Sequence, residues 1–267
     1  MEEIKKEDYQ EQACLLCKEE YRIPIGRILE KLDSHLSKND YAAGEALLRY
    51  WLEDAIRGRD LRGALTLQEE CMGLFRKLGK KEEALQAAEK ALELLSELDL
   101  EGTLAASTVR LNAGTVFSAF GDPDRAIGLF ETARKGYESL LPPDDSRLAG
   151  LYNNMALTLT ALGRYGEARE NYLSAISIMQ KDPEGKGEEA ISLLNLCNLV
   201  EAEKGLEAGD REIEEYLDRA ESLLAACPDT PHCAFVFEKC APSFSYYGYF
   251  AAAEELTKRA KEIYQKE

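Results

Sequence analysis

The fold is decided by residues 152–168, which read YNNMALTLTALGRYGEA. Apolar and small residues recur in this stretch at spacings of three and four, and Gly163 interrupts them. This spacing is typical of amphipathic helices, and a glycine can adopt the left-handed conformation that ends a helix. The stretch therefore predicts two antiparallel helices joined by a short turn at Gly163.

The same unit recurs along the chain. Gly79, Gly121 and Gly163 follow similar helix ends at a step of 42 residues, and Gly205 lies one step further on. The residues after each turn also match, as Ala84, Ala88 and Ala91, then Ala126, Phe130 and Ala133, then Ala168, Tyr172 and Ala175. A single helical hairpin cannot bury both of its faces, so neighbouring hairpins must stack. We therefore expect an all-α solenoid of about six hairpins, without strands.

The turn signals give the expected boundaries. First helices are predicted near residues 23–37, 61–78, 101–120, 145–162, 185–204 and 231–247, and second helices near 40–57, 81–98, 123–141, 165–180, 209–226 and 249–265. Residues 1–22 are predicted to be an N-terminal capping segment, and residues 23–267 the repeat domain.

Three copies depart from the common pattern. The first has Asn39 instead of the turn glycine, and asparagine can adopt the same left-handed conformation. The fifth has about three extra residues around Gly209, which predicts a non-standard turn. The last has Pro242 inside its first helix, where a proline costs about 3 kcal/mol or produces a kink.

The central copy resembles a tetratricopeptide repeat. Residues 162–168, LGRYGEA, resemble the turn motif of that family, and Tyr172 and Ala175 resemble its second-helix signature. The 42-residue step is similar to that of kinesin light chains and of bacterial peptide-sensing regulators. The resemblance covers about residues 23–265 and is strongest from 61 to 180. It implies a right-handed alpha-alpha superhelix that binds other polypeptides in a concave groove rather than catalysing a reaction.

The resemblance also implies a set of binding residues, because in this family the first helix of each hairpin lines the groove. The predicted peptide-binding residues are Arg76, Asn112, Thr115, Asn153, Asn154, Thr160 and Asn195. The same register places Leu157, Ser192 and Leu199 there. An asparagine amide both donates and accepts hydrogen bonds, so it can pair with the backbone of an extended peptide. The alternative is that these amides satisfy helix ends or face solvent.

A carboxylate clamp is not expected. Relatives that clamp a C-terminal carboxylate use paired lysines, and the corresponding positions here are Glu69 and Leu111.

The charge balance restricts the partners. Lys and Arg total 33 and Asp and Glu total 50, a net charge of −17. Nucleic acid and anionic membranes would be repelled, although acidic helix faces can also simply maintain solubility. The chain has no apolar run long enough to span a membrane and no secretion signal. Its seven cysteines are an odd number spread through helical segments, so a reduced, cytoplasmic protein is expected.

No pattern in the chain predicts catalysis. The one C-x-x-C pair, Cys14 and Cys17, has no further metal ligands nearby, and residues 227–240 hold three cysteines and a histidine at spacings that match no zinc template. Phosphate-binding loops and nucleophile motifs are absent from the sequence. We therefore predict no catalytic residue, no cofactor and no metal.

Two functions remain open. The first is a scaffold that holds an extended polypeptide. The alternative is a regulatory sensor or self-assembling subunit whose superhelix binds a small peptide signal and changes curvature, although residues 1–22 are too short for a helix-turn-helix effector. The aromatic cluster Tyr246, Tyr247, Tyr249 and Phe250 is predicted to pack between the final helices, with a partner contact, such as a homodimer through the terminal helices, as the alternative.

Overall fold

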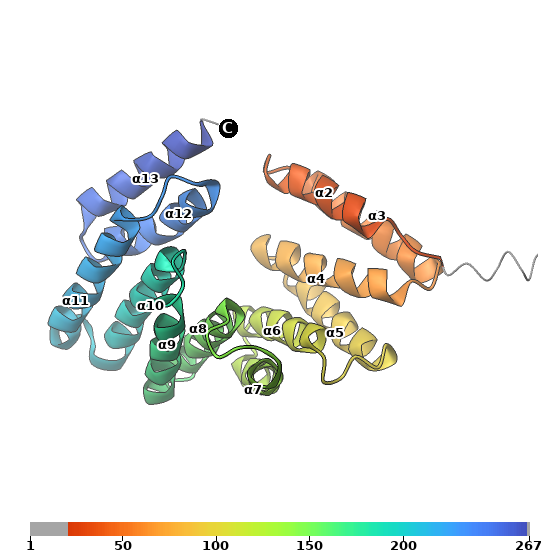
Figure 1. Cartoon of the computed structure of the whole chain (residues 1–267), viewed down its shortest axis with the longest axis horizontal. Coiled ribbons are helices and arrows are strands. Elements are labelled where there is room, and N and C mark those ends of the chain that lie inside the picture. The colour runs from red at the N-terminus through yellow and green to blue at the C-terminus, as the bar shows by residue number, and fades with distance from the viewer. Residues whose placement is uncertain (1–20, 266–267) are drawn as a thin grey trace, which may run out of the picture. The chain divides into compact units, whose positions relative to one another are not determined.

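A computed structural model of the chain describes residues 21–265, and over this range the chain forms twelve α-helices and no strand (Figure 1). The helices are α2 (Ile25–Leu36), α3 (Tyr41–Arg57), α4 (Leu61–Lys77), α5 (Lys81–Glu97), α6 (Leu104–Ala119), α7 (Pro123–Leu140), α8 (Ser146–Ala161), α9 (Tyr165–Met179), α10 (Lys186–Lys204), α11 (Leu206–Ala225), α12 (Pro231–Tyr246) and α13 (Phe250–Tyr264). They pair in sequence order into six hairpins. The predicted all-α class and the number of hairpins are confirmed, whereas the capping segment predicted for residues 1–22 lies almost wholly outside the described residues.

The chain divides into two compact units. Unit 1 ends at Glu101 and contains α2–α5, and unit 2 begins at Gly102 and contains α6–α13. In unit 2 the first helices of the hairpins, α6, α8, α10 and α12, contact one another in order, while each second helix packs mainly on its own partner. Unit 2 is therefore built of two layers, one of first helices and one of second helices (Figure 1).

The turn residues have the conformation that their sequence predicts. Gly79, Gly121 and Gly163 have φ of 69°, 92° and 72°, and Asn39 has φ of 56°. After Gly163 the amide of Arg164 donates to the carbonyl of Leu159 at 2.9 Å, and the glycine amide donates to that of Thr160 at 3.0 Å. These two bonds form a Schellman motif, which satisfies carbonyls at the end of α8.

Small residues allow the two helices of a hairpin to approach closely. Ala126 and Ala168 have no exposed surface. Gly114 in α6 lies against the buried ring of Phe130 in α7, and a Cβ atom there would be 2.6 Å from the ring atom Cε1. The spacing of α6 and α7 therefore depends on glycine at this position.

The fifth hairpin differs from the prediction at the start of its second helix. We expected α11 to begin near residue 209, but it begins at Leu206, directly after Gly205, whose φ of 79° and ψ of 163° end α10. The extra residues therefore extend α11 instead of forming a loop. Gly209 makes this extension possible, because a Cβ atom there would be 2.6 Å from Cγ1 of Val200 in α10.

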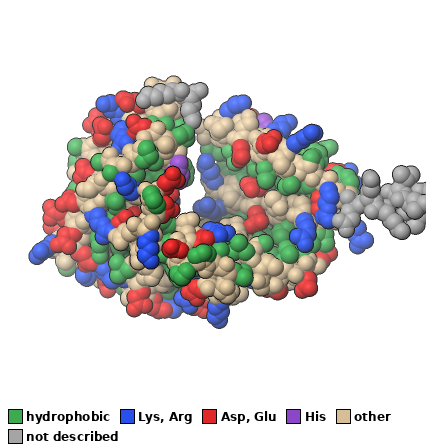
Figure 2. Space-filling model, in the orientation of Figure 1, with side chains coloured by type: hydrophobic (Ala, Val, Ile, Leu, Met, Phe, Trp, Pro, Cys, Tyr) green, Lys and Arg blue, Asp and Glu red, His purple; other side chains and the backbone are tan. Residues whose placement is uncertain are grey.

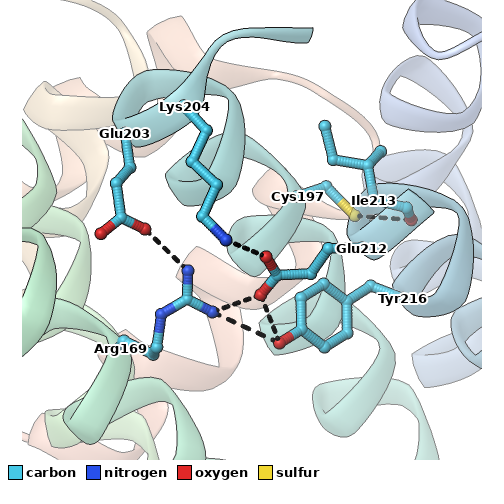
Figure 3. Close-up of polar contacts among 7 residues, drawn as sticks. All are labelled: Arg169, Cys197, Glu203, Lys204, Glu212, Ile213 and Tyr216. Atoms are coloured by element: carbon cyan, nitrogen blue, oxygen red, sulfur yellow. Dashed lines mark hydrogen bonds and ion pairs between the residues drawn. The ribbon is translucent and has the colours of Figure 1, made fainter. Parts of the chain in front are cut away.

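A cluster of charged side chains joins α9 to the end of α10 and the start of α11 (Figure 3). Arg169 of α9 pairs with Glu203 of α10 at 2.8 Å and with Glu212 of α11 at 2.6 Å. Lys204 pairs with Glu212 at 2.6 Å, and the Tyr216 hydroxyl donates to the same carboxylate at 3.2 Å. Partial burial disfavours the charged carboxylate, but the bonds from Lys204 and Arg169 outweigh it and lower the pKa of Glu212. The cluster therefore joins three helices through one carboxylate.

Pro242 lies inside a helix, as predicted. α12 extends on both sides of it, from Pro231 to Tyr246, and the proline ring is exposed. The proline therefore does not end the helix.

Candidate functional site

The solvent-facing side of the first-helix layer in unit 2, called here the first-helix face, carries most of the residues predicted to bind a peptide. Its half-buried or exposed residues are Thr108, Leu111, Asn112 and Thr115 on α6, Asn153, Asn154, Leu157 and Thr160 on α8, and Ile191, Asn195 and Asn198 on α10. They recur at spacings of three and four residues, so they form one stripe along each helix.

Two of the predicted amides bond to each other. Nδ2 of Asn195 donates to Oδ1 of Asn153 at 3.1 Å, and the Ser192 hydroxyl donates to the same oxygen at 3.2 Å. These bonds link α10 to α8. Asn153 can therefore offer its amide NH₂ group, and Asn195 its carbonyl oxygen, to a ligand.

Two further groove positions are buried. Leu199 is fully buried and Ser192 is 3% exposed. The prediction that Leu199 faces a ligand is wrong, because the repeat register was off by part of a helical turn and this side chain packs in the core.

Asn154 is the amide best placed to meet a ligand. It is half-buried on α8, and its side chain makes no hydrogen bond within the described part of the chain. Asn112, at the equivalent position on α6, is half-buried and already has an interaction partner. The predicted amides are thus not equivalent along the repeat.

The predicted threonines bond to their own helices. The hydroxyl of Thr115 donates to the carbonyl of Leu111 at 2.9 Å, and that of Thr160 donates to the carbonyl of Ala156 at 2.8 Å. The threonine hydroxyls therefore offer a ligand mainly acceptor lone pairs.

The first-helix face is nearly free of negative charge on α6 and α8. Neither helix contains an aspartate or glutamate, although the chain has 50. Arg147, at the start of α8, is paired with Asp145 at 2.7 Å. Leu157 lies in the middle of α8 with 42% of its surface exposed. The first helices of the third and fourth hairpins thus present a surface without acidic side chains of their own and with one exposed leucine.

Acidic residues gather on the second-helix layer instead. α11 alone carries Glu207, Asp210, Glu212, Glu214, Glu215, Asp218 and Glu221. Many acidic side chains lie on the visible face over α11, at the left of Figure 2. Sequence reasoning treated the net charge as a property of the whole chain and missed this division, which a count of charges helix by helix would have found.

The remaining predicted residue lies in the other unit. Arg76 is exposed near the C-terminal end of α4, in unit 1, and so is not part of the set in unit 2. On the same helix Glu69 and Glu70 are half-buried. Burial, helped by nearby Asp33, raises the pKa of Glu70. The acidic residues on α4 therefore distinguish it from α6 and α8, which have none.

The cysteines of the stretch near residue 230 lie in the packed core. Cys227, Cys233 and Cys240 are buried, whereas His232 is exposed and its Nε2 lies 2.8 Å from Glu188. Over residues 21–265, no three His, Cys, Asp or Glu side chains are grouped to hold a metal ion. The pair Cys14 and Cys17 lies outside the described residues. None of the helices within the described range is long and apolar enough to cross a membrane.

Comparison with known proteins agrees with the hairpin geometry. Residues 63–139 and 148–181 match models of the tetratricopeptide repeat. The chain therefore contains tetratricopeptide repeats over these two ranges. The comparison with curated proteins found no match.

Three solved structures have a fold similar to that of this chain. BtubC (BKLC) from P. vanneervenii is 23% identical with a TM-score of 0.64, over 76% of this chain and 82% of that one. A kinesin light chain-like protein of Podosopora anserina is 18% identical with a TM-score of 0.52, over 76% and 95%. A Rap protein, solved in complex with Competence and Sporulation Factor, is 17% identical with a TM-score of 0.55, over 92% and 66%. At these identities the likeness concerns the fold alone, and it agrees with the solenoid class predicted from the sequence.

Proposed function

We propose that the chain is a non-enzymatic scaffold that holds an extended polypeptide segment against the first-helix face of unit 2. The observation that carries this proposal is the combination of an unbonded amide at Asn154 with a surface that lacks acidic residues on α6 and α8. An amide pairs with a peptide backbone whatever the peptide sequence. The proposed ligand therefore presents its backbone to Asn154.

The exposed side chain of Leu157 lies one helical turn from Asn154 on α8. It offers an apolar contact to a ligand side chain, and burying it would contribute up to about 2 kcal/mol. The Rap protein of similar fold was solved with Competence and Sporulation Factor bound, which supports the use of such a solenoid for ligand binding. Carboxylates on the second-helix layer favour a neutral or basic ligand over an acidic one.

A selection experiment tests the proposal. The purified chain would be used to select binders from a library of random unstructured peptides, and the affinity of an enriched peptide would be measured by fluorescence anisotropy. The Asn154→Ala variant should bind roughly tenfold more weakly, because it loses one or two hydrogen bonds of about 1 kcal/mol each.

Asn171→Ala is the matched control. Asn171 lies on α9, the second helix of the same hairpin, and its Nδ2 donates to the carbonyl of Glu167 in the same helix at 2.8 Å. Its replacement should leave peptide affinity unchanged. The proposal fails if no peptide is enriched, or if the two variants weaken binding equally.

A further inference from the structure

The aromatic cluster near the end of the chain divides into two parts. Tyr246 donates to Glu201 at 2.6 Å, and Tyr247 donates to Asn198 at 2.9 Å, so both bind α12 to α10. The hydroxyl of Tyr249 donates to Asp218 of α11 at 2.8 Å. Of the four predicted aromatics, these three thus fasten the last hairpin to the one before it.

Phe250 does not take part in this packing. It is the first residue of α13, and 68% of its surface is exposed, the largest exposed fraction among the large hydrophobic residues described. It lines an open hollow of about 870 Å³ on the side of α12 and α13, together with Pro242 and Ala253. Within unit 2, no helix packs over this hollow. An exposed apolar surface of this kind marks an interaction site.

The charges that line the hollow from α13 are complementary to those of a second, antiparallel copy of the same helix. The charged residues that line it are Glu254, Lys258, Lys261 and Glu262 from α13 and Glu238 from α12. Glu254, Lys258 and Lys261 are spaced by four and three residues, so they lie on one side of α13. Neither Glu254 nor Lys261 forms an ion pair within the described residues. In an antiparallel pair of α13 helices with the two-fold axis between Thr257 and Lys258, Glu254 of each copy lies opposite Lys261 of the other.

The same axis places Phe250 opposite the alkyl part of Gln265 and keeps the two Glu254 carboxylates apart. A two-fold interface requires this self-complementarity, because every contact between the two copies occurs twice, once in each direction. We propose that the hollow between α12 and α13 is the interface of a homodimer, formed with a second copy of the chain through antiparallel α13 helices. This interface is separate from the first-helix face.

Sedimentation velocity over a range of protein concentrations tests the interface with charge reversals. The wild-type chain should form a dimer. Glu254→Lys should weaken it on the order of tenfold, because two favourable exposed pairs become two repulsive ones. Lys261→Glu should have the same effect.

The decisive sample is an equimolar mixture of the two single variants. Each variant alone opposes like charges. In a mixed pair the lysine introduced at position 254 meets the glutamate introduced at position 261 on one side, and the unchanged Lys261 meets the unchanged Glu254 on the other, so the mixture should dimerise again. Glu255→Lys is the control, since Glu255 lines a different hollow between α11 and α13, and this variant should remain dimeric. Far-UV circular dichroism would confirm that each variant is folded.

A wild-type chain that stays monomeric at every concentration would overturn the proposal. A dimer that either single variant leaves intact, or that the mixture does not restore, would equally rule out this antiparallel register.

Discussion

Two identical substitutions in one hairpin test how closely its helices pack. Gly114 in α6 and Gly128 in α7 both lie within helices. A Cβ atom at Gly128 would meet no other atom within 4 Å, whereas one at Gly114 would lie 2.6 Å from Cε1 and 2.8 Å from Cδ1 of Phe130. The ring of Phe130 is fully buried, so moving it would displace the side chains packed around it.

Replacing a helical glycine by alanine stabilises a helix by about 0.5–1 kcal/mol, so Gly128→Ala should raise the free energy of unfolding by that amount. Gly114→Ala gains the same term but must displace the buried ring, and such overpacking costs about 1–3 kcal/mol. The difference between the variants should therefore be about 1–3 kcal/mol, with Gly114→Ala less stable.

Urea unfolding followed by far-UV circular dichroism measures this difference. The two variants share the same chemical change and the same loss of backbone freedom in the unfolded chain, so their difference isolates the packing of α6 on α7. A Gly114→Ala variant as stable as Gly128→Ala, with the same dependence on urea, would refute the close approach of these helices.

Three further outcomes follow from single side chains. Asp60 is buried and accepts hydrogen bonds from the amides of Gly63 and Ile23, both at 3.0 Å, so Asp60→Ala should lower the free energy of unfolding by about 2–3 kcal/mol in urea titrations. The pKa of Glu212 is lowered in the folded chain, so its ion pairs stabilise the fold above the ordinary carboxyl pKa, and this stabilisation is lost as pH falls. Glu212→Gln should therefore be less stable than the wild-type chain at neutral pH, and the difference, measured from urea midpoints at several pH values, should shrink below about pH 5. Burial raises the pKa of Cys71 and Cys197 to about 12, so these thiols should react slowly in the folded chain. In a variant with Cys14→Ser and Cys17→Ser, a thiol reagent at about pH 8 should label the native chain slowly and the unfolded chain fast.

The hairpins could be predicted from sequence because their signals are local. A residue with positive φ marks each hairpin turn, Asn39 in the first hairpin and a glycine such as Gly163 in the others, and the small residues that follow mark the second helix. These signals depend only on neighbouring residues, so the twelve helices were placed within a few residues of their observed ends.

Contacts between hairpins could not be predicted in the same way. The bond between Asn195 and Asn153 depends on how α10 settles on α8, and this in turn depends on side chains far apart in the chain. The early start of α11 was missed within a hairpin, because the extension depends on the close approach of Gly209 to Val200 in the other helix. From the sequence alone, extra residues that end in a glycine are interpreted as a loop and not as the first turn of a helix.

The alternative of a sensor that changes curvature on binding a small peptide signal stays a prediction. It shares the first-helix face with the scaffold proposal and differs in the response of the solenoid, which small-angle scattering with and without a selected peptide would measure.

The most direct test of the proposed function is photo-crosslinking from two exposed leucines of the same hairpin. Leu157 on α8 and Leu173 on α9 are 42% and 49% exposed, so both accept a benzophenone amino acid without disturbing the core. A selected peptide should crosslink to the probe at position 157 and not to the probe at position 173. Equal crosslinking at both positions, or crosslinking at 173 alone, would contradict binding on the first-helix face.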